Sequence, residues 1–446
     1  MLLFLEFSLV KLYLAKLQIF NNAKVVINVI PLHAVNMKTM NHYFSHTLPN
    51  GLRLVHLPSK SNVAYCGFAV NAGTRDELPE EYGMAHFVEH MLFKGTKKRK
   101  AWHILNRMEN VGGELNAYTT KEETFVYSIF LKEHFQRALE LQADLIFNSI
   151  FPEHEIEKEV DVILDEINSY EDSPSELIFD EFENKVFSGH ALGHNILGDE
   201  KSLLTFNSNS GCSFMRRFYT PGNIVLFSMG DIKFDKIVKW ADNLLGVIPD
   251  YKAETNRQAP QIVEASQSVI EKDTHQAHVI MGQRAFSLHD EQRISLFLLN
   301  NMLGGPGMNS RLNIALRERH GLVYNVESNI TSYTDTGIAS IYFGTDPKNR
   351  EKATRLVCRE LESLCEKPLA EKSIAAAKKQ LIGQIGVNND NKESLFLGLG
   401  KSFLHYNRYD SQEEVVRQIE AISTEDIFNV ANQVFAPDKL FRLVYL

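Results

Sequence analysis

The sequence predicts an α+β protein made of two homologous domains, each a mostly antiparallel β-sheet covered by helices, that is, a duplicated unit. Two observations predict this class. The chain has 446 residues and 44% hydrophobic content, more core than one domain usually holds. Strand-like and helix-like segments also recur in the same order in both halves. We expect a first domain over residues 40–246, a linker over 247–265 and a second domain over 266–446.

Residues 1–39 are expected to be an N-terminal extension outside the fold. Its first 36 residues are apolar, but Glu6, Lys11 and Lys16 interrupt the run, and no clear cleavage site of small residues follows it. Met37 and Met40 stand just before the first strand-like pattern. A mis-assigned start codon therefore explains this extension at least as well as targeting does. No other stretch of the sequence is long and apolar enough to span a bilayer.

Periodicity and turn residues predict the elements of the first domain in order. The expected elements are two strands around the Pro49-Asn50-Gly51 turn, a buried strand over 62–74, a helix over 83–95, a helix from Trp102 to Gly112, and a strand over 124–131. After these come helices over 135–149 and 155–173, the second entered through Pro152 and closed near Pro174, then a strand over 223–232 and a helix through Trp240.

Composition narrows the class of function. Lys plus Arg is 47 and Asp plus Glu is 56, a net charge of −9 that gives no basic footprint for nucleic acid. The four cysteines, Cys66, Cys212, Cys358 and Cys365, are scattered and form no CxxC pair. We therefore expect a reducing compartment, and with it a cytoplasmic protein that binds no nucleic acid and no membrane.

The segment GMAHFVEHMLFKGT, residues 83–96, carries the chemistry. On a helix His86 and His90 share one face and can present two imidazoles to one cation, with Glu89 beside them. Two imidazoles plus one carboxylate leave a fourth zinc position for water, and an unligated carboxylate can take that water's proton. The pattern predicts a catalytic zinc site with Glu89 as its base.

A third ligand is required, and the helix EKEVDVILDEI offers several acids. Glu159 and Glu166 lie two turns apart on one face of this helix. Spacing alone leaves Glu159, Asp165 and Glu166 open as candidates. His190 and His194 are also four residues apart, but they lie in a Gly-rich stretch where that spacing has no geometric meaning.

The internal repeat places the metal chemistry in only one copy. Residues 276–305 follow the plan of residues 63–95, and residues 435–446 echo residues 219–230. In the second copy, the positions of the histidines and the glutamate are occupied by Phe297, Asn300 and Asn301.

From about Tyr43 to the C-terminus the chain resembles the pitrilysin-type (M16) zinc metallopeptidases, the inverzincins defined by a reversed HxxEH motif. It is most similar to the short two-domain bacterial members and the beta subunit of the mitochondrial processing peptidase. The resemblance implies Glu166, which lies 76 residues beyond His90, as the third ligand. It also implies that Glu159 is the acid that orients a ligand histidine.

Two further segments match the family. GGELNAYTTKEETFVYS resembles the edge strand on which these peptidases bind substrate as an added strand, which implies that Asn116 and Ala117 contact the peptide. An RxxxxxxY pattern implies catalytic roles for Arg317 and Tyr324, expected on a helix and the loop after it. By the resemblance, Tyr324 donates to the developing oxyanion and Arg317 holds the substrate backbone.

The resemblance thus implies a zinc-dependent endopeptidase with one Zn²⁺ per chain, acting on peptides or unfolded small proteins in a closed chamber. The alternative is a non-catalytic peptide-binding or structural subunit of the same fold. Two domains are half of the family's four-domain shell. We therefore expect a homodimer, or a heterodimer with a non-catalytic paralogue.

Overall fold

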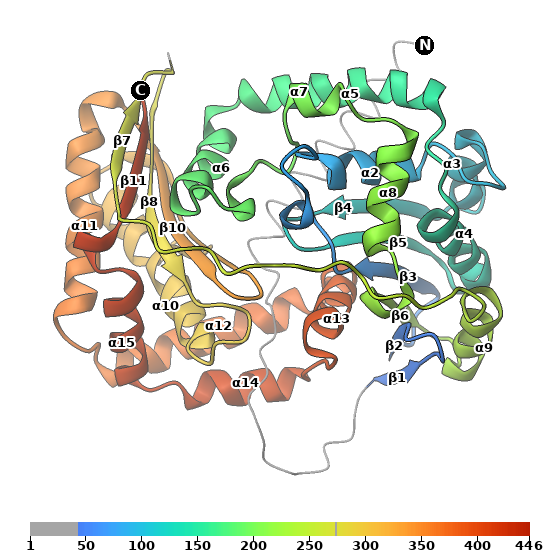
Figure 1. The fold of residues 1–446 in the computed structure, drawn as a ribbon. Coiled ribbons are helices and arrows are strands. Elements are labelled where there is room, and N and C mark those ends of the chain that lie inside the picture. The colour runs from blue at the N-terminus through green and yellow to red at the C-terminus, as the bar shows by residue number, and fades with distance from the viewer. Residues whose placement is uncertain (1–42, 273) are drawn as a thin grey trace.

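The computed structural model describes residues 43–272 and 274–446, and the expected N-terminal extension lies outside them. Figure 1 shows two helix-covered sheets side by side, joined by an extended segment. The first sheet has the order β1-β2-β6-β3-β5-β4 and the second β7-β11-β8-β10-β9. The α+β class with a duplicated unit is confirmed. Within the described residues, each helix is too short or too polar to cross a lipid bilayer.

The first sheet and its helices come from the first half of the chain. The strands are β1 (Phe44–Thr47), β2 (Arg53–Pro58), β3 (Val63–Val70), β4 (Glu114–Thr119), β5 (Thr124–Leu131) and β6 (Ile224–Gly230). The helices are α2 (Met84–Leu92), α3 (Ala101–Glu109), α4 (Phe135–Asn148), α5 (Glu153–Glu171), α6 (Pro174–Val186), α7 (Glu200–Leu203), α8 (Ser208–Phe218) and α9 (Phe234–Leu245).

The second sheet and its helices come from the second half of the chain. The strands are β7 (Gln267–Ile270), β8 (Ala277–Ala285), β9 (Val323–Ser332), β10 (Gly337–Thr345) and β11 (Phe441–Tyr445). The helices are α10 (Arg293–Gly304), a π-helix over Asn313–Glu318, α11 (Arg350–Glu366), α12 (Glu371–Asn388), α13 (Lys392–Tyr406), α14 (Gln412–Ala421) and α15 (Thr424–Val434).

Strand pairing repeats between the halves. β2 pairs in parallel with β6, and β7 pairs in parallel with β11. The other neighbours pair antiparallel in both sheets, so β6-β3-β5-β4 corresponds to β11-β8-β10-β9. Among the strands of residues 43–272 and 274–446, only β1, which pairs with the outer edge of β2, has no counterpart. The faint sequence repeat therefore reflects one topology used twice.

Each half covers one face of its own sheet and lends a helix to the other sheet. Residues of α6 pack on β8 and β11 of the second sheet, where Ile178 and Phe182 join Ile280 and Leu443 in one cluster. Conversely, α13 packs on β2, β3 and β6 of the first sheet. Figure 1 shows both helices lying against the sheet of the opposite half.

This exchange explains why the central strands read as continuous apolar runs. In β6, Leu226 faces the core under the first half's own helices, while Phe227 faces the cluster formed with Phe396 of α13. Every residue of β6 is buried, since both faces of the sheet are covered.

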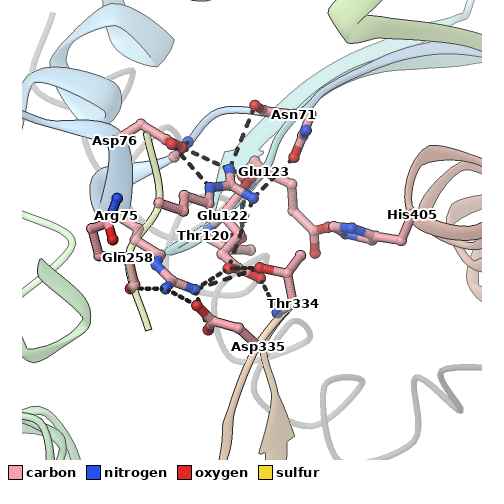
Figure 2. Close-up of polar contacts among 12 residues, drawn as sticks. Asn71, Arg75, Asp76, Thr120, Glu122, Glu123, Gln258, Thr334, Asp335 and His405 are labelled. Carbon is pink, nitrogen blue, oxygen red and sulfur yellow. Dashed lines mark hydrogen bonds and ion pairs between the residues drawn. The ribbon is translucent and has the colours of Figure 1, made fainter. Parts of the chain in front are cut away.

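A buried polar network joins the halves and the linker (Figure 2). Arg75 bonds to Glu122 Oε1 at 2.6 Å, to both oxygens of Asp335 at 2.8 and 2.6 Å, and to the carbonyl of Gln258 at 2.7 Å. Arg257 of the linker binds Asp76 through two bonds, at 2.9 and 2.7 Å. Residues 249–266 form no helix or strand, so these side chains hold the linker in place.

Candidate metal centre

The two histidines are carried by α2, whose apolar side is locked into the first core. Met84, Phe87, Val88 and Met91 are fully buried there. This burial leaves the His86 and His90 positions on the face that looks toward α5. Their side chains are only 4% and 8% exposed. The imidazole Nε2 atoms approach each other to 3.1 Å.

α5 brings the acids to this pair. Glu166 Oε2 lies 3.6 Å from Nε2 of both histidines. Glu159 Oε1 lies 2.9 Å from Nδ1 of His90, on the far side of that ring. Asp165, the remaining candidate ligand, is exposed. The structure therefore places Glu166 Oε2 at the same distance from both Nε2 atoms and Glu159 behind one imidazole.

The donor set suits a tetrahedral cation. Ligand atoms of His86, His90 and Glu166 all lie within 4.8 Å of one another, and this is the one such group of His, Cys, Asp and Glu within the described residues. Two nitrogens each about 2.0–2.1 Å from a tetrahedral zinc would stand ~3.3 Å apart, close to the separation of the two Nε2 atoms. Two imidazoles and one carboxylate also leave one position open.

Glu159 and Lys94 determine which ring nitrogen of His90 carries the proton. Burial raises the pKa of Glu159, but its bonds to His90 and Lys94 outweigh this, so the pKa lies below its ordinary range. An ionised Glu159 accepts the Nδ1 proton of His90, which leaves the Nε2 lone pair free for a cation. Lys94 pairs with the other oxygen of Glu159. The sequence analysis missed Lys94, although it stands four residues after His90.

Glu89 lies between the two histidines in the sequence and is half-buried. Its carboxylate does not belong to the group formed by His86, His90 and Glu166, so it is available for another role. In the second copy the equivalent helix is α10, where Asn300 donates to the carbonyl of Ser328 on β9 at 2.9 Å. In the second half, the Asn300 amide therefore links α10 to β9.

Asn116 and Ala117 lie in β4, the edge strand of the first sheet. β4 pairs with β5 on one side only, with Asn116 opposite Tyr127 and Ala117 opposite Val126. α2 packs against β4, so this edge strand lies next to the helix that carries His86 and His90.

Arg317 and Tyr324 lie on the other half. Arg317 is in the π-helix, and Tyr324 is the second residue of β9, where a loop was expected; that detail was wrong, because β9 begins at Val323. The Arg317 guanidinium lies 5.5 Å from the centre of the Tyr324 ring, and Tyr324 is 84% exposed. The structure thus brings Arg317 and Tyr324 together, on the half that does not carry the two histidines.

Comparison with known proteins agrees with the geometry. Residues 54–200 match the family described as insulinase (peptidase family M16), and residues 205–381 match the peptidase M16 inactive domain. A protein of Bacillus subtilis named an uncharacterized zinc protease, YmxG, is 33% identical over 401 residues, 90% of this chain and 97% of that protein. An uncharacterized zinc protease of Rickettsia felis is 34% identical over 391 residues, 87% of this chain and 94% of that protein.

Two solved structures share the fold. A protease from Helicobacter pylori superposes with a TM-score of 0.84 at 22% identity, covering 91% of this chain and 100% of that one. A Pseudomonas fluorescens structure described as a peptidase M16 inactive domain gives a TM-score of 0.83 at 21% identity, covering 90% of this chain and 98% of that one. The resemblance predicted from the sequence is confirmed: the chain belongs to the M16 peptidase family.

Proposed function

We propose that this protein is a zinc-dependent endopeptidase that hydrolyses peptides or unfolded small proteins. The observation that carries the proposal is the grouping of His86, His90 and Glu166, with Glu159 bonded behind His90. Side chains with a purely structural role do not usually bring two imidazoles and a carboxylate together at one point. The names of the two relatives, both zinc proteases, support the choice of metal.

In this proposal, His86, His90 and Glu166 would hold a zinc ion, which would act as a Lewis acid toward the scissile carbonyl and would lower the pKa of the attacking water. Glu89 takes the proton of that water and later passes it to the leaving amine. Tyr324 donates to the carbonyl oxygen as its negative charge develops, and Arg317 holds the substrate backbone. Losing one such donor typically costs about 3 kcal/mol of transition-state stabilisation.

Substrate would bind as an added strand on the free edge of β4. Main-chain hydrogen bonds at Asn116 and Ala117 would give affinity with little demand on sequence. The open edge supports this mode, since β4 has a partner on one side only. The unpaired N–H and C=O groups of an edge strand can pair with another chain, and in this proposal that chain is the substrate.

The proposal includes a closed chamber completed by a second chain. A homodimer, or a heterodimer with a non-catalytic paralogue, would supply the other half of the enclosure. The four free cysteines are compatible with the proposed cytoplasmic location. Light scattering of the purified protein tests the dimer directly.

The test compares the full chain with Glu89→Gln, Glu166→Gln and the control Asp165→Asn. We expect about one zinc per chain in the parent, the Glu89 variant and the control. Only the parent and the control should cleave a quenched fluorescent peptide library, and Glu166→Gln should lose zinc. A parent that binds zinc but cleaves nothing alone would point to a missing partner chain. A parent without zinc would leave the non-catalytic subunit as the function.

A further inference from the structure

We infer that Glu77 is a positioning residue of the metal centre, which ties the first turn of the histidine-bearing helix α2 to the polar network between the two halves. The inference rests on the proposed zinc function. It is carried by a buried carboxylate that precedes α2 in the chain and bonds to the backbone at its start.

Glu77 binds the beginning of α2 with both of its oxygens. Oε2 accepts from the N–H of Gly83 at 3.0 Å, and Oε1 accepts from the N–H of Ala85 at 2.8 Å. Glu77 is 7% exposed. The first N–H groups of a helix have no partner within the helix, and no side chain of the N-cap residue serves α2, since that residue is Gly83. Glu77 therefore supplies the cap from outside the helix.

Gly83 is shaped for this contact. Its φ is +94°, a left-handed conformation that favours glycine. A Cβ there would lie 2.7 Å from the carbonyl oxygen of Leu197. The chain therefore passes close to Leu197 where it enters α2, and in this conformation the N–H of Gly83 bonds to Glu77. Ala85, the second donor, directly precedes His86, so the same contact fixes the turn that carries the first histidine.

The segment before Glu77 is itself held firmly. The N–H groups of Thr74 and Arg75 donate to the carbonyls of Thr120 and Lys121, at 3.2 and 2.7 Å. The Arg75 side chain, 1% exposed, enters the network with Glu122 and Asp335 shown in Figure 2. Glu77 therefore extends from an anchored segment. It transmits the position of that network to α2.

Burial raises the pKa of Glu77 well above its ordinary range, and the bonds from Ala85 and Gly83 oppose this shift. In either protonation state, glutamine at this position could replace only one of the two acceptors. Its NH₂ group would face the other N–H, which would leave a buried donor without a partner and shift the first turn of α2.

The test measures metal binding by the full-length chain, Glu77→Gln and the control Glu81→Gln. Glu81 lies in the same loop, but its side chain accepts from the N–H of Leu78 at 3.1 Å and pairs with Arg217, so it makes neither of the bonds to Gly83 and Ala85. The readouts are the zinc dissociation constant by chelator competition, the absorption spectrum of the Co²⁺-loaded protein, and the melting temperature of the metal-free protein.

We expect Glu77→Gln to weaken zinc binding about 10–100-fold, the usual effect of losing a group that orients ligands, and to change the Co²⁺ spectrum. Glu81→Gln should leave both unchanged. A merely structural role would lower the melting temperature without changing the dissociation constant or the spectrum, and that result would overturn the inference. A parent that binds neither metal would overturn the proposed function, and the inference with it.

Should Glu77→Gln fail to fold, Glu77→Asp provides the second test. It keeps a carboxylate but is one methylene shorter, so it cannot hold both N–H groups in the same position. A Co²⁺ spectrum that differs from the parent's is expected. A spectrum identical to the parent's would count against Glu77.

Discussion

Two glycines of one helix give matched tests of the exchange between halves. Gly398 and Gly400 both lie in α13. A Cβ at Gly398 would meet nothing within 4 Å, whereas a Cβ at Gly400 would lie 2.7–2.8 Å from three atoms of the Phe227 ring on β6. Gly400→Ala should therefore disturb the packing of α13 on the first sheet, and Gly398→Ala should not.

The magnitude follows from what surrounds Phe227. The ring is fully buried, stacked on Phe396 with centroids 4.4 Å apart and set edge-on to Phe125 at 5.5 Å, so it cannot give way cheaply. Both substitutions gain about 1 kcal/mol of helix propensity. Overpacking a tight core costs roughly 1–3 kcal/mol, and only Gly400→Ala meets it. The propensity gain cancels in the comparison, which leaves a difference of about 1–3 kcal/mol.

The assay is the free energy of unfolding from urea titration, followed by circular dichroism, for the parent and both variants. Gly398→Ala should unfold at higher urea than the parent, and Gly400→Ala should unfold at lower urea than Gly398→Ala. Equal stabilisation by the two substitutions would refute the reasoning, because it would mean that α13 does not lie against Phe227.

Three further predictions concern buried titratable side chains. Glu159→Gln should weaken zinc binding about 10–100-fold, because His90 loses the carboxylate that orients it; an unchanged dissociation constant in chelator competition would contradict this role. Burial lowers the pKa of His56 to about 4 from 6.5. The unfolded chain thus binds this proton first, and stability present above pH 6.5 is lost as the pH falls toward 4, by about 3 kcal/mol. Urea titrations across that range should show the decline, and His56→Gln should make it shallower; burial also lowers the pKa of His194 to about 4, so part of the decline should remain. Glu123→Gln should cost about 3 kcal/mol at neutral pH, because Lys401 loses its buried partner; a denaturation midpoint equal to the parent's would contradict that.

Local periodicity was enough to place the two histidines of the proposed metal site together. Residues four apart on a helix share a face whatever the rest of the chain does, so His86 and His90 could be placed together from the sequence. The same local logic explains why the repeat could be read, since both copies use the same order of strands and helices. Local spacing could not distinguish Glu159, Asp165 and Glu166 without the resemblance to the family. The residue pattern of one helix face does not show which other element packs against it. Only the contact between α5 and α2 distinguishes them, with Glu166 close to both Nε2 atoms and Glu159 behind His90.

By itself the sequence determined the fold class, the duplication and the pairing of the two histidines, because these follow from local periodicity and from the same order of elements in both halves. The tertiary structure decided which sheet each helix covers. The apolar face of α6 or α13 does not specify its partner, because either sheet could bury it. It also decided how α2 is fixed. Glu77 meets the start of α2, and Lys94 meets Glu159, only because the folded backbone brings them together. The spacing of residues in the sequence does not predict that backbone path.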